Sequence, residues 1–294
     1  MTGDGAEVIA IIRAGANVNA RNRYGETALM LAAEAQGDTE CMRALISGGA
    51  DLGWALIYAA GSGNVNKVRV LIDAGAESNP ECLLCAAFNG HNECVAALMN
   101  GGADVDVALM LAAKGSPPSP GTGPTLVASF RGRFASRSTT HIYANAVKVL
   151  IAGGANVNLK YADDETALIL AAKDNHGDHV RGNSESLEAL IAAGADVNVM
   201  NVFGDTALGI ATKKALNGLS RTVEVLIAAG ADVNVNTPLM TAVANRNDKC
   251  VKALVAAGAN VNFAIKGGVT PLMAAVAAGC LLYTSDAADE EDSV

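Results

Sequence analysis

Aliphatic residues recur at fixed distances before a glycine along most of the chain. Eight glycines have an aliphatic residue or Met three, four and seven positions upstream, as Gly15 has Ile12, Ile11 and Val8. This spacing places the apolar residues on one face of a helix, and a glycine directly after it is typical of a helix C-terminus. The sequence therefore predicts eight short helices, which end before Gly15, Gly49, Gly75, Gly102, Gly154, Gly194, Gly230 and Gly258.

A second segment precedes seven of these helices and also follows the last. Its clearest copies are Thr27-Ala-Leu-Met-Leu-Ala-Ala33, Thr166-Ala-Leu-Ile-Leu-Ala-Ala172 and Thr270-Pro-Leu-Met-Ala-Ala-Val276. A Thr followed by Ala or Pro favours a helix start, and small residues allow a neighbouring helix to approach closely. In the weaker copies, which begin at Trp54, Glu81 and Val107, we expect Asn79 with Pro80, or Asp106, to replace the missing Thr cap.

Each pair of predicted helices is followed by Gly-Ala-(Asp/Asn)-Val-Asn or a variant of it. This unit resembles the ankyrin repeat family, whose signature runs D-x-x-G-x-T-P-L-H-x-A-A and ends in G-A-D-V-N. The resemblance covers almost all of residues 4 to 280. It implies an all-α fold, an ankyrin-repeat solenoid of stacked antiparallel helix pairs with β-hairpin fingers on some repeats. We expect seven complete helix pairs and a half-repeat at each end.

The repeats depart from the family signature in two ways. Four copies place 12 residues between the glycine and the Thr position, whereas the copies that end at Trp54, Glu81, Val107 and Thr237 have only 5 to 7 and so lack the finger. The His of the signature is replaced throughout, mostly by aliphatic residues or Met, which predicts apolar contacts in place of a polar network. Gly209 occupies that position once, where it is expected to cost about 1 kcal/mol relative to Ala.

The ankyrin repeat domain is expected to span residues 1–280, with an inserted loop at about 115–140. The insertion begins Pro/Gly/Ser-rich and becomes basic around Arg131 to Arg137. It is either a partner-binding or phosphorylated loop, since Arg133 to Ser136 has the form R-x-x-S, or a surface insertion without a role, because long loops cost little entropy.

Residues 281–294 are expected to form an acidic disordered tail. The segment after Ala278, GCLLYTSDAADEEDSV, breaks the repeat pattern and resembles translated sequencing-adapter sequence. Both ends of the repeat pattern therefore look cut. Five acidic residues of this tail account for five units of the formal net charge of −9, which leaves −4 for the rest of the chain.

A mildly acidic body lacks the basic surface that phosphate backbones require, so we expect no nucleic-acid partner. The N-terminus has no cationic leader, and charged or polar residues interrupt each apolar run well before the roughly 20 residues of a membrane span. We therefore expect a cytoplasmic protein that does not enter membranes. With 51% hydrophobic but only 4% aromatic residues, the composition fits thin, closely packed helices.

No known catalytic motif is present, so we expect no enzyme activity, catalytic residue, cofactor or metal site. Cys82-Leu-Leu-Cys85 lacks a second pair for zinc, and reduced, partly buried thiols account for all six cysteines. His176 and His179 flank Gly-Asp in a second insertion, which favours a solvated loop over a metal site.

The family resemblance implies that finger tips and the exposed ends of the first helices bind a partner protein on the concave face of the stack. We therefore expect a non-catalytic, monomeric scaffold. The alternative is a regulatory ankyrin array of a larger enzyme or channel that has been truncated. The predicted binding residues are Arg21, Arg23, Tyr24, Lys160, Asp163, Lys173, Met200, Val202, Phe203, Lys213 and Lys214.

The sixth copy is the distinctive one, because Met200, Val202 and Phe203 place apolar side chains on a finger. Exposed apolar clusters with a charged rim often mark interaction surfaces. In the alternative interpretation, these side chains fold back onto the next finger.

Overall fold

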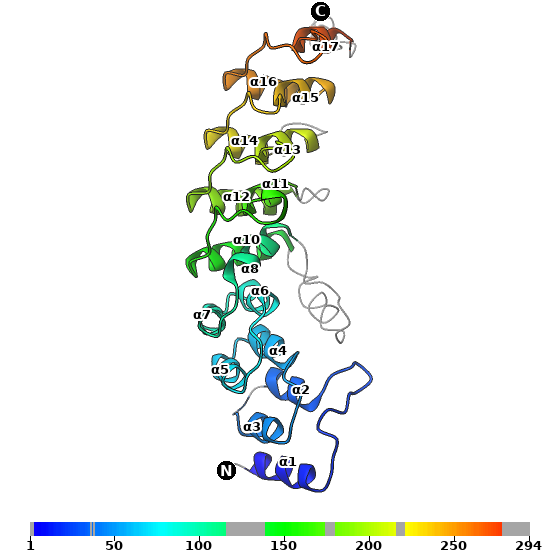
Figure 1. Cartoon of the computed structure of the whole chain (residues 1–294), viewed down its shortest axis with the longest axis vertical. Coiled ribbons are helices and arrows are strands. Elements are labelled where there is room, and N and C mark those ends of the chain that lie inside the picture. Colours follow the sequence, from blue (N-terminus) through cyan, green and yellow to red (C-terminus); the bar gives the residue numbers. More distant parts are fainter. Residues whose placement is uncertain are drawn as a thin grey trace, which may run out of the picture. The chain divides into compact units, whose positions relative to one another are not determined.

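The computed structural model describes residues 3–35, 37, 39–115, 139–173, 180–215 and 221–277. The chain forms two compact units, Met1–Val157 and Asn158–Val294, and each is a stack of short helices (Figure 1). The predicted insertion, except for its two ends, lies outside the described residues. The predicted tail, His176 and His179 lie outside them as well. A single domain over residues 1–280 stays a prediction.

The first unit holds nine of the described helices. They are α1 (Gly3–Arg13), α2 (Ala28–Glu34), α3 (Glu40–Ser47), α4 (Ala55–Ser62), α5 (Val65–Asp73), α6 (Pro80–Phe88), α7 (Asn92–Asn100), α8 (Val105–Ala113) and α10 (Thr139–Ala152). The second unit holds a 3-10 turn, η1 (Ala162–Asp164), and seven described α-helices. They are α11 (Ala167–Lys173), α12 (Val180–Ala192), α13 (Ala207–Lys214), α14 (Arg221–Ala228), α15 (Pro238–Ala244), α16 (Asp248–Ala256) and α17 (Pro271–Ala277).

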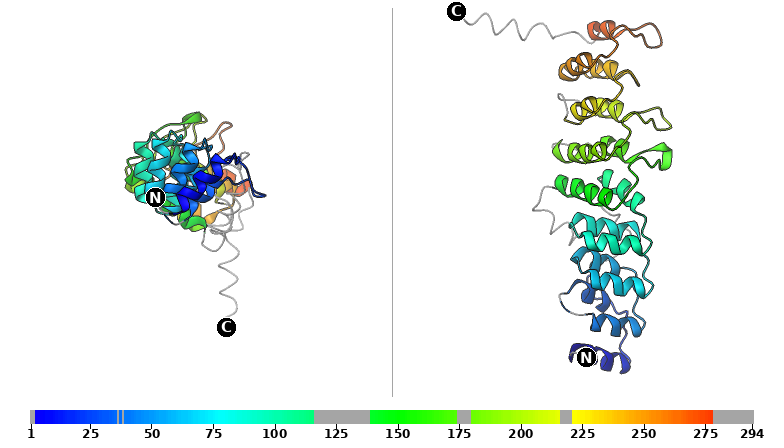
Figure 2. Two further views of the ribbon diagram at one scale, coloured as in Figure 1. Left: turned by 90° about the horizontal axis from the view of Figure 1, so that it is seen from below. Right: turned by 90° about the vertical axis from the view of Figure 1, so that its left-hand side faces the viewer.

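These helices confirm the predicted arrangement. Within the described residues there are seven helix pairs, from α2 with α3 to α15 with α16, while α1 precedes the first pair and α17 follows the last. The first helices of successive pairs pack on each other inside each unit, as α4 does on α2 and α6 (Figures 1 and 2). Helix α10 begins at Thr139, inside the C-terminal end of the predicted insertion.

The two helices of a pair are buried differently. First helices are short and apolar on all sides, and residues Ala55 to Ala60 of α4 and Ala167 to Ala172 of α11 are buried throughout. Second helices are amphipathic: α14 buries Val223 and Leu226 and exposes Glu224. A first helix thus lies between its own partner and its neighbours, which matches its uniformly apolar sequence.

Each second helix ends at its repeat glycine in the left-handed conformation. The eight glycines have φ between 83° and 93°. The amide of the following Ala donates to the carbonyl five residues earlier, as Ala195 does to Leu190 at 3.0 Å. This is the Schellman arrangement, in which glycine avoids the steric cost of a positive φ.

The last residue of Gly-Ala-Asp-Val-Asn joins one repeat to the next. The Asn158 side chain donates to the Gly194 carbonyl at 3.0 Å and accepts from the Asp196 amide at 2.8 Å. Asn19 and Asn198 make the same two bonds to the turns that follow them. Because one side chain satisfies both a donor and an acceptor of the next turn, this asparagine ladder fixes the spacing of adjacent repeats.

Four of the connections before first helices are long and form the fingers. We name residues 20–26 finger 1, 159–165 finger 5, 199–205 finger 6 and 263–269 finger 8. Each closes with one backbone hydrogen bond, such as that from the Asn201 amide to the Asp205 carbonyl at 3.1 Å. No strand is assigned in the described residues, so the fingers are closed turns without paired strands. In the second unit they project from one side of the stack (Figure 2).

The helix caps agree with the sequence in some repeats and differ in others. Thr27, Thr206 and Asn79 cap α2, α13 and α6 as predicted. The cap of α8 is Asp104 and not Asp106, since the Asp104 carboxylate accepts from the amides of residues 106 and 107 at 3.0 Å. The Asp106 carboxylate instead accepts from the Asn156 amide at 2.6 Å, as a member of the ladder.

Polar contacts between repeats are present, but they do not lie at the position of the signature His. The residues that replace the signature His are buried and apolar in five repeats, for example Met30 and Leu84. The polar bridges lie at the ends of the first helices instead, where the His91 ring contacts the Gly61 carbonyl at 3.2 Å and Asn247 donates to the Ala215 carbonyl. These bridges satisfy carbonyls that a helix end leaves open.

The cysteines of the described residues belong to the packed interior. Cys82, Cys85, Cys94 and Cys250 are buried, and Cys41 is partly buried. Burial raises the pKa of the Cys82 thiol to about 12 and that of Cys94 to about 11. The described residues contain no cluster of His, Cys, Asp and Glu that could hold a metal ion.

The ladder makes a testable contribution to stability. We expect Asn158→Ala to lower the free energy of unfolding by about 1 to 2 kcal/mol, because two hydrogen bonds are lost. Urea denaturation measures the change. Asn262→Ala is the matched control, since Asn262 has the same place in the last repeat but its side chain has no partner in the described part of the chain. Equal midpoints for the two variants would show that the ladder does not stabilise the stack.

The thiols should differ in reactivity. At pH 8 we expect iodoacetamide to modify Cys41 at least tenfold faster than Cys82, because the raised pKa keeps the Cys82 thiol protonated and burial blocks access. Mass spectrometry of timed digests follows each cysteine. Equal rates for Cys41 and Cys82 in the folded chain would contradict the buried placement of Cys82.

Candidate protein-interaction surface

Finger 6 is shaped by an asparagine at its base. The Asn201 side-chain oxygen accepts from the amides of Phe203 and Asp205 at 3.0 and 2.9 Å. Gly204, with φ of 74°, completes the tight turn. Asn22 organises finger 1 in the same way, by accepting from the amides of Tyr24 and Glu26. Both fingers therefore present an aromatic residue, Phe203 or Tyr24, at the same point of the turn.

Finger 5 reaches a similar path by a different route. Tyr161 stands where fingers 1 and 6 have the organising asparagine, and the turn η1 is formed with Asp163 and Asp164 in the left-handed region at φ of 60° and 58°. Asp is among the residues that tolerate this region. The Tyr161 ring cannot accept from the loop amides as the Asn side chain does, and it is exposed at the outside of the finger.

Fingers 5 and 6 are joined directly. The Val202 amide donates to the Asp163 carbonyl at 3.0 Å. This bond links the tips of the two turns, which are 39 positions apart in the sequence. The two fingers thus form one continuous surface.

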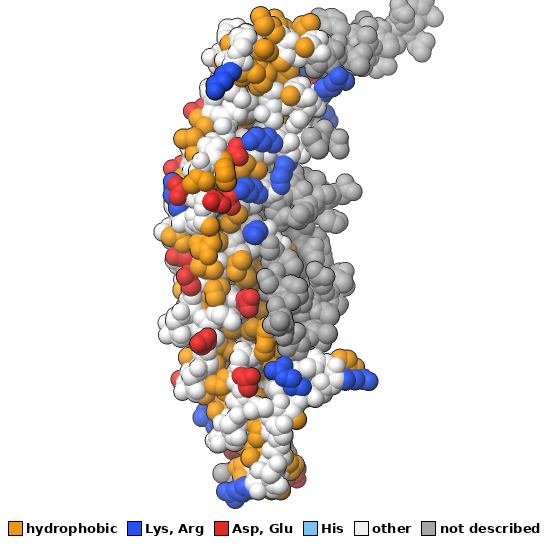
Figure 3. Space-filling view, turned by 45° about the vertical axis from the view of Figure 1, so that its right-hand side comes forward, with side chains coloured by type: hydrophobic (Ala, Val, Ile, Leu, Met, Phe, Trp, Pro, Cys, Tyr) orange, Lys and Arg blue, Asp and Glu red, His pale blue; other side chains and the backbone are white. Residues whose placement is uncertain are grey.

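The surface is apolar at its centre. Four large side chains are at least half exposed: Tyr161 at 55%, Met200 at 50%, Val202 at 59% and Phe203 at 68%. Met200, Val202 and Phe203 were predicted from the sequence, whereas Tyr161 was missed. The signal that could have identified Tyr161 is the lack of Asn at this position of the finger. A side chain that does not accept from the amides of the turn is free to lie on the outside of the finger, as Tyr161 does. Figure 3 shows hydrophobic side chains next to charged ones on one face of the chain.

The lysines expected around this centre are mostly paired. Lys213 bonds to Asp205 at 2.6 Å, Lys160 to Asp164 at 3.3 Å, and Lys173 to Glu165. Two of these pairs join residues eight positions apart, from the base of a finger to the last turn of the helix after it. Ion pairs that are exposed, as Lys160 with Asp164 is, contribute little stability, but all three pairs balance the charge of the rim. Lys214 lies beside Lys213 in the last turn of α13.

The remaining predicted residues lie in the other unit, on finger 1. Arg21 donates to the Gly25 carbonyl at 3.3 Å, and the Arg23 guanidinium lies over the Tyr24 ring, 4.5 Å from its centroid. The structure thus brings eight of the eleven predicted residues onto fingers 5 and 6 and the helices that follow them. Arg21, Arg23 and Tyr24 form a separate group.

None of the described helices has the length and apolar character that a membrane crossing requires. Models of the ankyrin family match most of the chain. A three-repeat model, described as ankyrin repeats (3 copies), matches residues 2–82, 134–235, 180–263 and 214–285, and a single-repeat model matches residues 82–109. These ranges leave out residues 110–133, which include most of the insertion.

A curated relative is the ankyrin repeat domain-containing protein SAT10 of the fungus Stachybotrys chartarum. The two are 36% identical over 105 residues, which is 32% of this chain and 5% of that protein. The match therefore spans a small part of the relative's length. On the family matches, which cover most of its residues, and on the repeated helix pairs of both units, the chain belongs to the ankyrin repeat family.

Proposed function

We propose that the chain is a non-catalytic binding module that holds a partner protein through fingers 5 and 6. Ankyrin repeats are generally protein–protein interaction modules, and the family is typically non-catalytic. The observation that carries the specific proposal is the exposed apolar centre of Tyr161, Met200, Val202 and Phe203 on two linked turns.

The exposure of these side chains argues against the interpretation that they fold back onto the next finger. The next repeat has a short connection, residues 231–236, so no finger stands beside Val202 and Phe203 on that side. Both side chains remain more than half exposed. A soluble surface rarely gathers large apolar side chains unless something covers them, which supports an interaction site.

The order of the turns also favours binding. The backbone of finger 6 is held by Asn201 and by the bond from Val202 to Asp163, so little conformational freedom remains to be lost when a partner binds. Phe203 is a rigid aromatic anchor of the kind enriched at interface centres. Because the rim charges are paired, we infer that apolar contact and not long-range attraction dominates the affinity.

The test is the substitution Phe203→Ala. We expect it to weaken partner binding at least tenfold, since removal of an aromatic anchor at an interface centre typically costs about 2 kcal/mol or more. The melting temperature should change by less than about 2 °C, because the exposed ring contributes little to the helix stack. Affinity capture with the full chain identifies the partner, and calorimetric titration then compares the variants.

Ile265→Ala is the matched control. Ile265 is an exposed aliphatic residue on finger 8, away from the proposed surface, and its removal should leave the affinity within about twofold of wild type. Equal affinities for wild type and Phe203→Ala would place the partner on another part of the chain.

A further inference from the structure

Fingers 1, 5 and 6 are each contacted from the side of the following repeat, and they differ in the group that makes the contact. Finger 5 is followed by finger 6 and bonds to it through Val202 and Asp163. Fingers 1 and 6 are each followed by a repeat that lacks a finger. In both cases, a side chain of the fingerless repeat takes the place of the missing turn.

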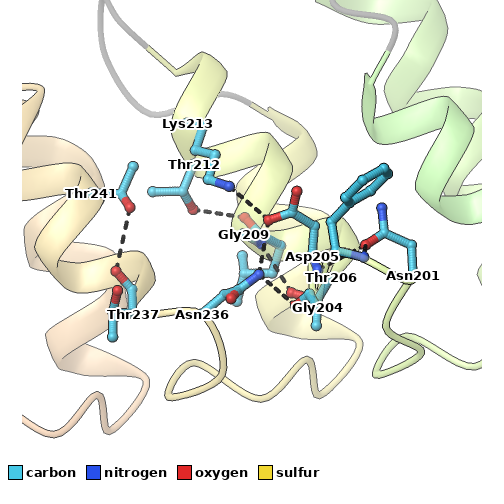
Figure 4. Close-up of polar contacts among 12 residues, drawn as sticks. Asn201, Gly204, Asp205, Thr206, Gly209, Thr212, Lys213, Asn236, Thr237 and Thr241 are labelled. Atoms are coloured by element: carbon cyan, nitrogen blue, oxygen red, sulfur yellow. Dashed lines mark hydrogen bonds and ion pairs between the residues drawn. The ribbon is translucent and has the colours of Figure 1, made fainter.

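Asn236 supports finger 6. Its side-chain nitrogen donates to the Gly204 carbonyl at 2.6 Å and to the Asp205 carboxylate at 3.0 Å (Figure 4). The Asp205 carboxylate also accepts from the Lys213 ammonium group. It therefore has one donor from the following repeat and one from α13, the helix that follows the finger. Asn236 therefore donates to two consecutive residues of the turn, directly after Phe203.

The connection of the seventh repeat, residues 231–236, has a strained backbone where it carries this side chain. Asn236 and Thr237 have φ of 64° and 50°, whereas the matching Thr206 is extended at φ of −96°. A β-branched residue such as Thr237 rarely adopts a positive φ. Thr237 also makes no side-chain cap for α15, although Thr206 caps α13. In this loop, α15 lacks a side-chain cap and two residues have a strained backbone, and the same conformation places the Asn236 side chain against the finger.

Gly209 leaves the space that Asn236 occupies. A Cβ at position 209 would lie 3.3 Å from the Asn236 Cβ and 3.4 Å from the Thr206 hydroxyl oxygen. The distance to Asn236 is tighter than ordinary contact, so a side chain there would press against the Asn236 stem. The glycine that the sequence shows at a helix-interior position therefore has a packing reason in the neighbouring repeat.

Finger 1 has the same support from a different residue. The Tyr58 hydroxyl of α4, in the second repeat, donates to the Glu26 carboxylate at 3.3 Å. Glu26 and Asp205 occupy the same place, eleven residues after their repeat glycines. Burial and the nearby Glu26 raise the pKa of Tyr58, which keeps the hydroxyl protonated as a donor.

We propose that a fingerless repeat anchors the finger before it through one donor side chain, and that Asn236 is the positioning residue of the finger 6 surface. The effect of Asn236 on partner binding rests on the proposed function. Its effect on the finger itself does not, and can be measured without a partner.

Limited proteolysis of the full chain by chymotrypsin tests the anchor. Cleavage after Phe203 requires local opening of finger 6, and cleavage after Tyr24 in finger 1 serves as an internal reference. We expect Asn236→Gly to raise the ratio of the two initial rates at least tenfold. Glycine tolerates the positive φ without strain, so the change removes the amide group and preserves the backbone.

Asn234→Gly is the matched control. Asn234 lies in the same connection, but its side chain accepts from the Asn260 amide of the following repeat at 2.8 Å. This variant should leave the cleavage ratio within about twofold of wild type. An unchanged ratio in Asn236→Gly, or an equal rise in Asn234→Gly, overturns the proposal.

Binding measurements separate the anchor from the function. If Asn236 acts through the finger, Phe203→Ala combined with Asn236→Gly should lose less affinity than the sum of the losses in the two single variants. An additive loss overturns the positioning role. Faster cleavage in Asn236→Gly with wild-type affinity would reject the proposed binding surface and leave the anchor in place.

Discussion

The left-handed glycine at the end of each second helix is the constraint on which the rest of the structure depends. In all eight repeats a Cβ at this glycine would meet no atom within 4 Å, so the residue is required by the backbone angle and not by crowding. The angle turns the chain out of the helix and brings the next residues to the edge of the stack. The asparagine ladder and the fingers both begin from this point.

Helix packing and finger formation therefore use different parts of each repeat. The helices stack mostly through small and aliphatic residues, and they do so whether or not a finger follows the glycine. Fingers 1, 5 and 6 are each contacted by the following repeat through one or two hydrogen bonds. Finger 5 accepts from a backbone amide of finger 6, whereas fingers 1 and 6 accept from a side chain. The loss of a finger in one repeat thus changes what the neighbouring finger requires.

The sequence predicted the features that repeat and missed those that join one repeat to another. Helix positions and the caps Thr27 and Thr206 follow from local spacing, so they could be read directly. The α8 cap was assigned to Asp106 instead of Asp104, because an Asp at either position is able to cap a helix. The hydrogen bond from the Asn156 amide to Asp106 distinguishes the two, and the sequence does not show it. The finger residues come from the family pattern, whereas Asn236 acts on residues 31 and 32 positions away, where the sequence alone gives no distances. Tyr161 was missed for a local reason, because the lack of the organising asparagine at its position was not recognised. The ion pair of Lys213 with Asp205 was within reach, because Lys173 and Glu165 repeat its spacing.

Amide hydrogen exchange of the full chain, free and bound to its partner, tests the central claim most directly. If the partner covers the linked turns, residues 159–165 and 199–205 should gain protection on binding, while the outward faces of α12 and α14 should exchange at the same rate in both states. Protection confined to the second helices, with fingers 5 and 6 unchanged, would contradict the account.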